Sequence, residues 1–324
     1  MASPDPISLA HEGTLELAPK VVIGLVDVAA VGARVLLSLE PSAGWTVRET
    51  PLELRGLQPT STTSTSTTTT TAATSHPEGG GEAVRPVLAV AGAGASSSFS
   101  PASDAQSAPA VALVRNFFSE ASPASPAVSL LILNALIPEE AQAEVAAALL
   151  ELVDGRGAPA AEASGAGTAD APAGRGAEGG AAPSLTVVAA MLLQHLAQPA
   201  ALYQHLINGA VPLDAALPPL QPPACSETTA PGPVIRVRDG QLAALLHVVG
   251  VSGTPAACLL APGHKPPASS SPDLPGSAAA CDTIGTALAA ALGLRYDTER
   301  CRTVRALYKW FVPERAAGSD VMYL

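Results

Sequence analysis

The chain has 324 residues and a formal net charge of −11 at pH 7, with 17 Lys and Arg against 28 Asp and Glu. This acidic balance argues against nucleic acid as a partner, because binding to phosphates depends on clustered cations. Hydrophobic residues reach 48% of the chain largely through alanine, and aromatic residues make up only 3%, so we expect one core built from a few strongly apolar blocks.

Short apolar runs and amphipathic stretches alternate in the first half of the chain. The runs at 86–91 and 128–133 are continuous and rich in Val, Leu or Ile, which predicts strands buried on both faces of a sheet. Pro138 suits the first turn of a helix, and Glu139 and Glu140 suit its positive end. The apolar face of that helix is Val145, Leu149, Leu152 and Val153. The elements expected, in order, are a strand at 20–26, a helix at 28–39, strands at 46–54, 86–91 and 128–133, and a helix at 138–153.

The same alternation returns in the last third of the chain. Asp residues suit helix N-caps there, and Gly residues suit helix ends. Apolar stripes at helical spacing support two of these helices: Leu242, Leu245, Leu246 and Val249 in one, and Ile284, Leu288 and Leu292 in the other. The elements expected are a strand at 234–237, a helix from Asp239 to Gly250, a strand at 254–260, a helix from Asp282 to Gly293, and a helix from Asp297 to about Phe311, ended by Pro313.

Strands that alternate with helices predict parallel β-α-β units. We therefore expect an α/β fold, a three-layer α/β/α sandwich with a mostly parallel sheet, interrupted by disordered low-complexity insertions. Three runs dominated by Ser, Thr, Ala, Gly or Pro cannot bury enough apolar surface to become ordered. The organisation expected is a flexible N-terminus at 1–19, a single α/β domain at 20–312 with insertions at 60–83, 155–183 and 266–280, and a flexible docking tail at 313–324.

The cysteines and the apolar segments indicate the cellular compartment of the protein. No C-x-x-C spacing links the cysteines, which we interpret as free thiols in a reducing compartment: Cys225, Cys258, Cys281 and Cys301. Residues 1–6 lack the pattern of a secretory signal. The longest apolar stretch, 21–39, is interrupted by Asp27 and Arg34, so we expect no membrane span. These features favour a cytoplasmic location and leave the nucleus open as a second one.

Candidate catalytic patterns are incomplete. Residues 92–96 follow a predicted strand but lack both the third glycine of a dinucleotide fingerprint and the Gly-Lys-Ser/Thr of a P-loop. Residues 250–254 approach the G-x-S-x-G of a nucleophile elbow, yet Thr254 stands where glycine is needed. Three histidines, His195, His205 and His247, have no carboxylate or cysteine at ligand spacing. We expect no catalytic residues, no cofactor and no metal site, and thus a protein that is not an enzyme.

The C-terminus combines a polar segment, 314–320, with an abrupt apolar ending. Met322, Tyr323 and Leu324 match the HbYX pattern, a hydrophobic residue followed by tyrosine and any terminal residue, which inserts into pockets between proteasome α subunits. The α-carboxylate of Leu324 would pair with a pocket lysine, while the Tyr323 ring and Met322 would fill apolar space. These three residues are the predicted protein-binding site.

The body of the chain resembles the proteasome assembly chaperone 1 family in the order of its elements. The strand at 20–26 opens the domain, and the apolar strand at 128–133 falls in its middle. Residues 236–246 then lead through Gly250 to a Pro-initiated strand at 254–259, before the last helices and the Tyr-bearing terminus. The resemblance covers about half of the chain.

This resemblance implies a three-layer fold like that of nucleoside phosphorylases, without phosphorylase activity. It also implies a heterodimer with proteasome assembly chaperone 2 that holds α subunits while the α ring of the 20S core particle forms. Met322 and Tyr323 would enter an α-subunit pocket, and the Leu324 carboxylate would meet its lysine.

Two alternatives remain open at this point. Met322-x-Leu324 also fits a PDZ ligand, which would add a strand to the edge of a sheet on another protein. The chain could instead be a phosphorylase-like or hydrolase-like α/β enzyme whose site residues are dispersed, in which case a polar pocket is expected at the strand ends.

Overall fold

A computed structural model describes residues 6–57, 84–90, 110–155, 184–193, 200–220, 236–237, 239–263, 275–306 and 322–323. The insertion expected at 60–83 lies outside these residues, and so does the one at 155–183 apart from Gly155. The third expected insertion, 266–280, overlaps a helix that begins at Pro275. Its last six residues are therefore helical, which corrects the expected boundary.

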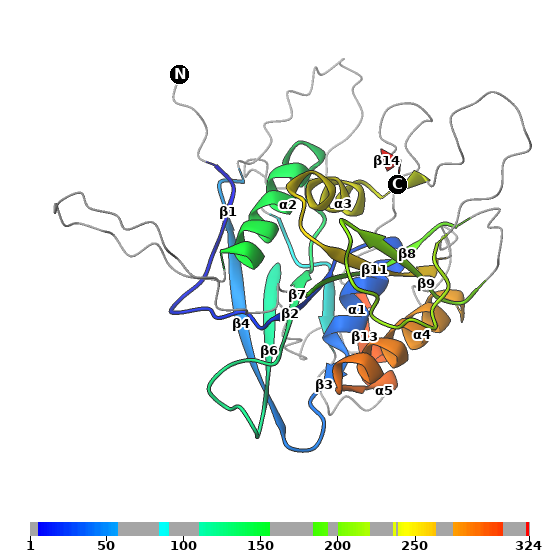
Figure 1. The fold of residues 1–324 in the computed structure, drawn as a ribbon. Helices are drawn as coiled ribbons and strands as arrows, with labels where there is room; N and C mark the ends of the chain where they lie inside the picture. The colour runs from blue at the N-terminus through cyan, green and yellow to red at the C-terminus, as the bar shows by residue number, and fades with distance from the viewer. Residues whose placement is uncertain are drawn as a thin grey trace, which may run out of the picture.

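One sheet of eight strands runs through the molecule (Figure 1). Its strands, in spatial order, are β1 (Ser8–Ala10), β4 (Trp45–Arg55), β6 (Ala112–Ser119), β7 (Val128–Leu133), β2 (Lys20–Gly24), β8 (Ser184–Met191), β11 (Ala256–Pro262) and β9 (Tyr203–Ile207). Strands β2, β4, β7 and β11 confirm four predicted strands. Strands β1, β6, β8 and β9 were not predicted.

The sheet is mixed, so the expectation of a mostly parallel sheet is wrong. Parallel pairing is confined to the centre, where β7, β2, β8 and β11 are neighbours. The β1–β4, β4–β6, β6–β7 and β11–β9 pairs are antiparallel. The eight residues between β6 and β7 allow a hairpin but are too few for the crossover that parallel neighbours require.

Helices lie on both faces of the sheet (Figure 1). On one face, α2 (Glu139–Asp154) and α3 (Gly240–Ser252) pack on Val21 and Ile23 of β2. On the other, α1 (Val31–Leu37), α4 (Pro275–Leu292) and α5 (Thr298–Thr303) belong to the cluster that contains Val22. Alternate residues of a strand point to opposite faces, so this central strand contributes to two separate cores. The predicted apolar stripes of α2, α3 and α4 all face these cores.

Three predicted helix boundaries differ from the structure. Gly250 lies inside α3, which ends at Gly253 in the left-handed conformation (φ +74°). Asp282 lies inside α4 and does not cap it, although Gly293 ends this helix as predicted (φ +71°). The helix predicted to run from Asp297 to about residue 311 stops at Thr303, where the chain turns into a strand.

The first helix is also interrupted near its start. A short 3₁₀ turn, η1 (Val28–Ala30), precedes α1 and contains Ala29 at φ +56°, and Ala30 follows at φ +52°. Left-handed backbone costs about 1–2 kcal/mol per non-glycine residue. The strain is offset by Asp27, which accepts a hydrogen bond from Gly32 N (2.9 Å) and another from Ala190 N.

Short two-stranded pairs complete the described structure. They join β3 (Leu39–Glu40) to β12 (Arg295–Tyr296), β5 (Leu88–Val90) to β13 (Val304–Ala306), and β10 (Arg236–Val237) to β14 (Met322–Tyr323). The predicted strand at 86–91 therefore exists as β5, but it lies outside the main sheet.

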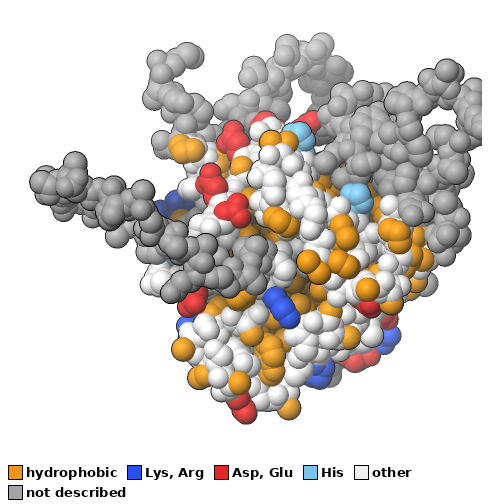
Figure 2. Space-filling model, viewed as in Figure 1, with side chains coloured by type: hydrophobic (Ala, Val, Ile, Leu, Met, Phe, Trp, Pro, Cys, Tyr) orange, Lys and Arg blue, Asp and Glu red, His pale blue; other side chains and the backbone are white. Residues whose placement is uncertain are grey.

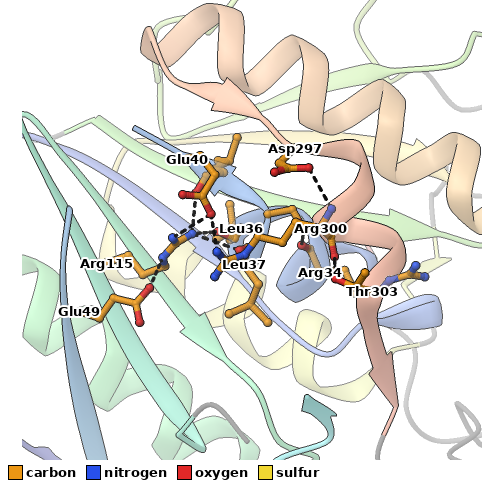
Figure 3. A network of polar contacts seen from close by, with 11 residues as sticks. Arg34, Leu36, Leu37, Glu40, Glu49, Arg115, Asp297, Arg300 and Thr303 are labelled. Carbon is orange, nitrogen blue, oxygen red and sulfur yellow. Dashed lines mark hydrogen bonds and ion pairs between the residues drawn. The ribbon is translucent and has the colours of Figure 1, made fainter. Parts of the chain in front are cut away.

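A buried arginine ties β6 to α1 (Figure 3). Arg115 is 1% exposed, and its Nη1 donates to the carbonyl oxygens of Leu36 (2.9 Å) and Leu39 (2.6 Å). Its Nε donates to Glu49 Oε1 (2.9 Å) from the neighbouring strand. Burial lowers the pKa of this guanidinium, while the negative charge of Glu49 opposes that shift. Carbonyl groups at the end of a helix lack partners within the helix, and Arg115 supplies some of those missing donors at the end of α1.

Candidate docking site at the C-terminal strand

Two of the three residues predicted to bind a partner, Met322 and Tyr323, pair through their backbone with a strand of the domain. Strand β14 is antiparallel to β10, with Met322 opposite Val237 and Tyr323 opposite Arg236. Leu324, the third residue of the predicted motif, lies outside the described part of the chain. In this structure the backbone of Met322 and Tyr323 is thus extended and paired, and not held clear of the domain. Their role in binding a partner stays a prediction.

Strand β10 is anchored because it leads directly into α3. Val237 is 1% exposed and belongs to the same core cluster as Leu242 and Leu245 of this helix. Asp239 caps α3 as predicted, with its Oδ1 accepting a hydrogen bond from Leu242 N (2.8 Å). The cap satisfies one of the free N–H groups of the first turn, which fixes the direction in which β10 enters the helix.

Gln241 holds the same helix start to the loop that follows β7. Its Oε1 accepts from Ile137 N (3.0 Å), and its Nε2 donates to Ala135 O (3.1 Å). Gly240 lies so close to Gln142 of α2 that an added Cβ would come within 2.6 Å of Oε1. The start of α3, which follows β10, is therefore fixed to α2 and to the loop after β7. The sequence analysis missed Gln241, since a glutamine is usually exposed and nothing in its spacing marks it as buried.

Acidic side chains lie at the start of α3 and on the neighbouring helix α2. Asp239 is partly exposed, yet the atoms around its carboxyl remove enough water to raise its pKa to about 6, against the hydrogen bond from Leu242 N. Figure 2 shows acidic side chains gathered over α2. The exposed acidic residues of this helix are Glu139, Glu140, Glu144, Glu151 and Asp154. A basic partner surface would complement this face.

The catalytic patterns weighed in the sequence do not assemble into a site within the described residues. Ser252 donates to Val249 O (3.0 Å) and to Thr254 Oγ1 (2.9 Å), so its hydroxyl stabilises the end of α3. His205 lies in β9, where burial lowers its pKa, and His247 is exposed on α3. His195 and the segment 92–96 lie outside the described residues.

The carboxyl ends of the central strands, where an α/β enzyme usually binds its ligand, are filled by the protein itself. Asp27 is fully buried beyond β2, and burial raises the pKa of its carboxyl well above the ordinary value. A Cβ on Gly263, after β11, would come within 2.9 Å of Val28. Beyond β7, Asn134 Oδ1 accepts from Leu88 N (2.9 Å), and its Nδ2 donates to Leu88 O (3.1 Å). Among the described residues, these polar groups hold the connections between elements in place.

Two further kinds of feature are absent from the described residues. Within them, no three His, Cys, Asp or Glu side chains come together in a way that could hold a metal ion. In the same part of the chain, no helix has the length and apolar character needed to cross a membrane.

No protein-family model and no curated protein matches this sequence. Among solved structures, the chain is similar to PbaB of Pyrococcus furiosus, an archaeal proteasome activator, with 12% identity over 92% of this chain and 93% of that chain and a TM-score of 0.43. It is also similar to PbaA of the same organism, an archaeal homolog of proteasome-assembly chaperone, with 11% identity over 92% and 90% of the two chains and a TM-score of 0.41. A protein of unknown function from Thermoplasma acidophilum shares 12% identity over 89% of this chain and 83% of its own, with a TM-score of 0.41. Two of these three similar structures are thus proteasome-related proteins.

Proposed function

We propose that this chain is a chaperone for assembly of the 20S proteasome. It binds α subunits as a heterodimer with a partner similar to proteasome assembly chaperone 2, and it docks Met322, Tyr323 and Leu324 in a pocket of the α ring. On this proposal it is not an enzyme, and it works in the cytoplasm and, as a second location, in the nucleus.

The observation that carries the proposal is the ending of the chain. A hydrophobic residue, a tyrosine and a terminal residue occur in this order, and the first two have extended backbone. An extended peptide can place a side chain and a free carboxylate in separate subsites of a pocket. The order of strands and helices that resembles the assembly chaperone family supports the same reading.

The acidic character of the chain agrees with a lysine-bearing partner surface. The net charge is −11, and α2 carries five acidic residues and no Lys or Arg. Complementary charge raises the rate at which two proteins meet and disfavours acidic partners.

The first experiment is capture of partners from cell extract. The bait is the intact chain, and a second bait lacks the last three residues. We expect both baits to recover a chaperone-2-like protein, and the intact bait to recover more proteasome α subunits, because only it carries the docking residues. Absence of every proteasome subunit from both captures would overturn the proposal.

Single substitutions then separate this proposal from a PDZ ligand. Loss of a buried aromatic anchor commonly costs at least about 2 kcal/mol, or roughly 30-fold in affinity, so Tyr323→Ala should weaken binding to purified α rings by at least that factor. Ser319→Ala, in the polar part of the tail, is the matched control and should leave the affinity unchanged. A PDZ ligand would instead tolerate Tyr323→Ala and lose binding with Leu324→Ala.

A further inference from the structure

Two cysteines from different helices meet in the core between α1, α4 and α5. Cys281 lies on α4 and is 1% exposed, and Cys301 lies on α5 and is 2% exposed. Both belong to the same core cluster, and their side chains are hydrogen-bonded to each other. Two thiols in contact can be oxidised together, whereas an isolated buried cysteine has no sulfur partner.

The surroundings of this pair favour negative charge on Cys301. The guanidinium of Arg34 lies beside it and donates from Nη2 to its backbone oxygen (3.3 Å). The hydrogen bond from Cys281 lowers the pKa of Cys301 to about 6, an effect that burial opposes and that the charge of Arg34 reinforces. The same hydrogen bond, together with burial, raises the pKa of Cys281 well above its ordinary value. One sulfur is therefore the natural nucleophile of the pair, and the other holds its proton.

Tyr296 fixes the geometry from the other side. Its hydroxyl donates to Asp282 Oδ1 (3.1 Å), on the residue next to Cys281. Its ring packs so closely on Gly285 that no side chain fits there. The two helices are thus held at a fixed distance around the thiols, with Asp297 capping α5 through Arg300 N (2.9 Å).

We propose that Cys281 and Cys301 form an oxidisable thiol pair that closes to a disulfide between α4 and α5 when the protein meets a peroxide. The thiolate of Cys301 attacks one oxygen of hydrogen peroxide, which gives a sulfenic acid on Cys301 and, after uptake of a proton, one water. The sulfur of Cys281 then attacks the sulfenic sulfur, a second water leaves, and the S–S bond forms. In total the two thiols lose two protons and two electrons, and the peroxide is reduced to two waters.

Cys258 provides a matched internal control. It is 0% exposed in β11, where burial raises the pKa of its thiol to about 12. Cys258 is therefore as buried as the pair but protonated. Within the described residues, no other cysteine contributes to its pKa. Because all three thiols are buried, the peroxide reaches any of them only through local opening of the structure.

The test treats the folded full-length protein with hydrogen peroxide, blocks the remaining thiols with an alkylating reagent, and maps peptides without reduction. We expect a linked Cys281–Cys301 peptide pair that is lighter by two hydrogens than the two free peptides and is separated by dithiothreitol, while Cys258 is recovered alkylated once the protein is unfolded. Cys258→Ser should form the same link, and Cys301→Ser should not.

The parent protein alone decides the outcome, so the result does not depend on whether a variant folds. Recovery of Cys281 and Cys301 as separate alkylated or over-oxidised peptides would overturn the proposal. Linkage of either one to Cys225 would do the same, and so would a Cys281–Cys301 link that forms only in denaturant.

Discussion

Replacing Arg115 by methionine should destabilise the protein strongly, because a hydrophobic side chain cannot donate hydrogen bonds to the acceptors that the guanidinium now binds. Methionine keeps most of the apolar stem of the arginine, so the loss of packing is small. The carbonyl oxygens of Leu36 and Leu39 would remain buried without their present donor, and Glu40, only 16% exposed, would lose a neighbouring positive charge (3.8 Å).

The magnitude follows from these partners. A buried acceptor left unsatisfied costs about 1–3 kcal/mol, and the carbonyl oxygens of Leu36 and Leu39 both lose their donor. Glu40 adds less, because Arg300 Nη1 stays 2.6 Å from its Oε1. The bond to Glu49 also adds little, because that carboxylate is 48% exposed. We therefore expect the free energy of unfolding to fall by roughly 2–5 kcal/mol.

Arg48→Met is the matched control. Arg48 lies on β4, is exposed, and stacks on Phe118 at 5.2 Å, much as Arg115 stacks on Phe117 at 5.5 Å. Both substitutions remove a stacked cation, but only one removes buried hydrogen bonds, so the control should lose about 0.5–1 kcal/mol. Equilibrium unfolding in urea, followed by circular dichroism, measures both. A loss at Arg115 of less than about 1 kcal/mol, or one no larger than the control, would refute the reasoning.

Two further predictions concern α3. Gly253→Ala should lower the free energy of unfolding by about 1 kcal/mol, because residue 253 has φ +74° with open space around it, whereas Gly250→Ala should raise it by about 0.5–1 kcal/mol inside the same helix. Urea unfolding of the two variants checks this, and the same sign for both would contradict the helix end. Asp239→Asn should keep the helix cap but remove the titration of residue 239. The pKa of Asp239 in the folded protein, about 6, lies above the ordinary 3.8. The carboxyl therefore contributes its full stabilisation below pH 3.8 and loses it as the pH rises through 6. The stability of the variant relative to the parent should therefore rise by on the order of 1–3 kcal/mol over this window, and a difference that is flat with pH would contradict the shift.

The sequence predicted the helices that pack on the sheet because their apolar residues repeat at helical spacing. Leu242, Leu245, Leu246 and Val249 are all buried in the core on one face. Asp239 and Asp297 cap helices as predicted, since each accepts a backbone hydrogen bond three residues ahead. Such signals are local, and a single sequence contains them.

The strands that were missed break the local rules for a reason that is visible only in three dimensions. Strand β6 carries Arg115 and Asn116 in its middle, where an isolated sequence suggests a loop. Both side chains are buried because distant carbonyl oxygens satisfy them, and Asn116 Nδ2 donates to Glu16 O (2.9 Å), 100 residues away. Strand β8 directly follows the Ala/Gly run and itself contains two Ala and two Val, so its composition does not stand out clearly from the run before it. The prediction of a mostly parallel sheet rested on the alternation of strands and helices. It failed because β6, which was not predicted, forms an antiparallel hairpin with β7.

The candidate site could be named from the sequence but not placed by it. A pairing of two residues, β10 with β14, has no periodicity to detect, and its partners are more than 80 residues apart.

The short length of the β10–β14 pairing also matters for the proposed docking. A ladder of this length contains few hydrogen bonds, each worth about 0.5–1.5 kcal/mol net, so releasing β14 costs on the order of 1–3 kcal/mol. A cost of this size weakens binding by roughly 5-fold to 150-fold, because only the released fraction of the molecules is competent to bind. The pairing therefore moderates docking without preventing it, and a partner that binds the released terminus more tightly than β10 does will displace the strand.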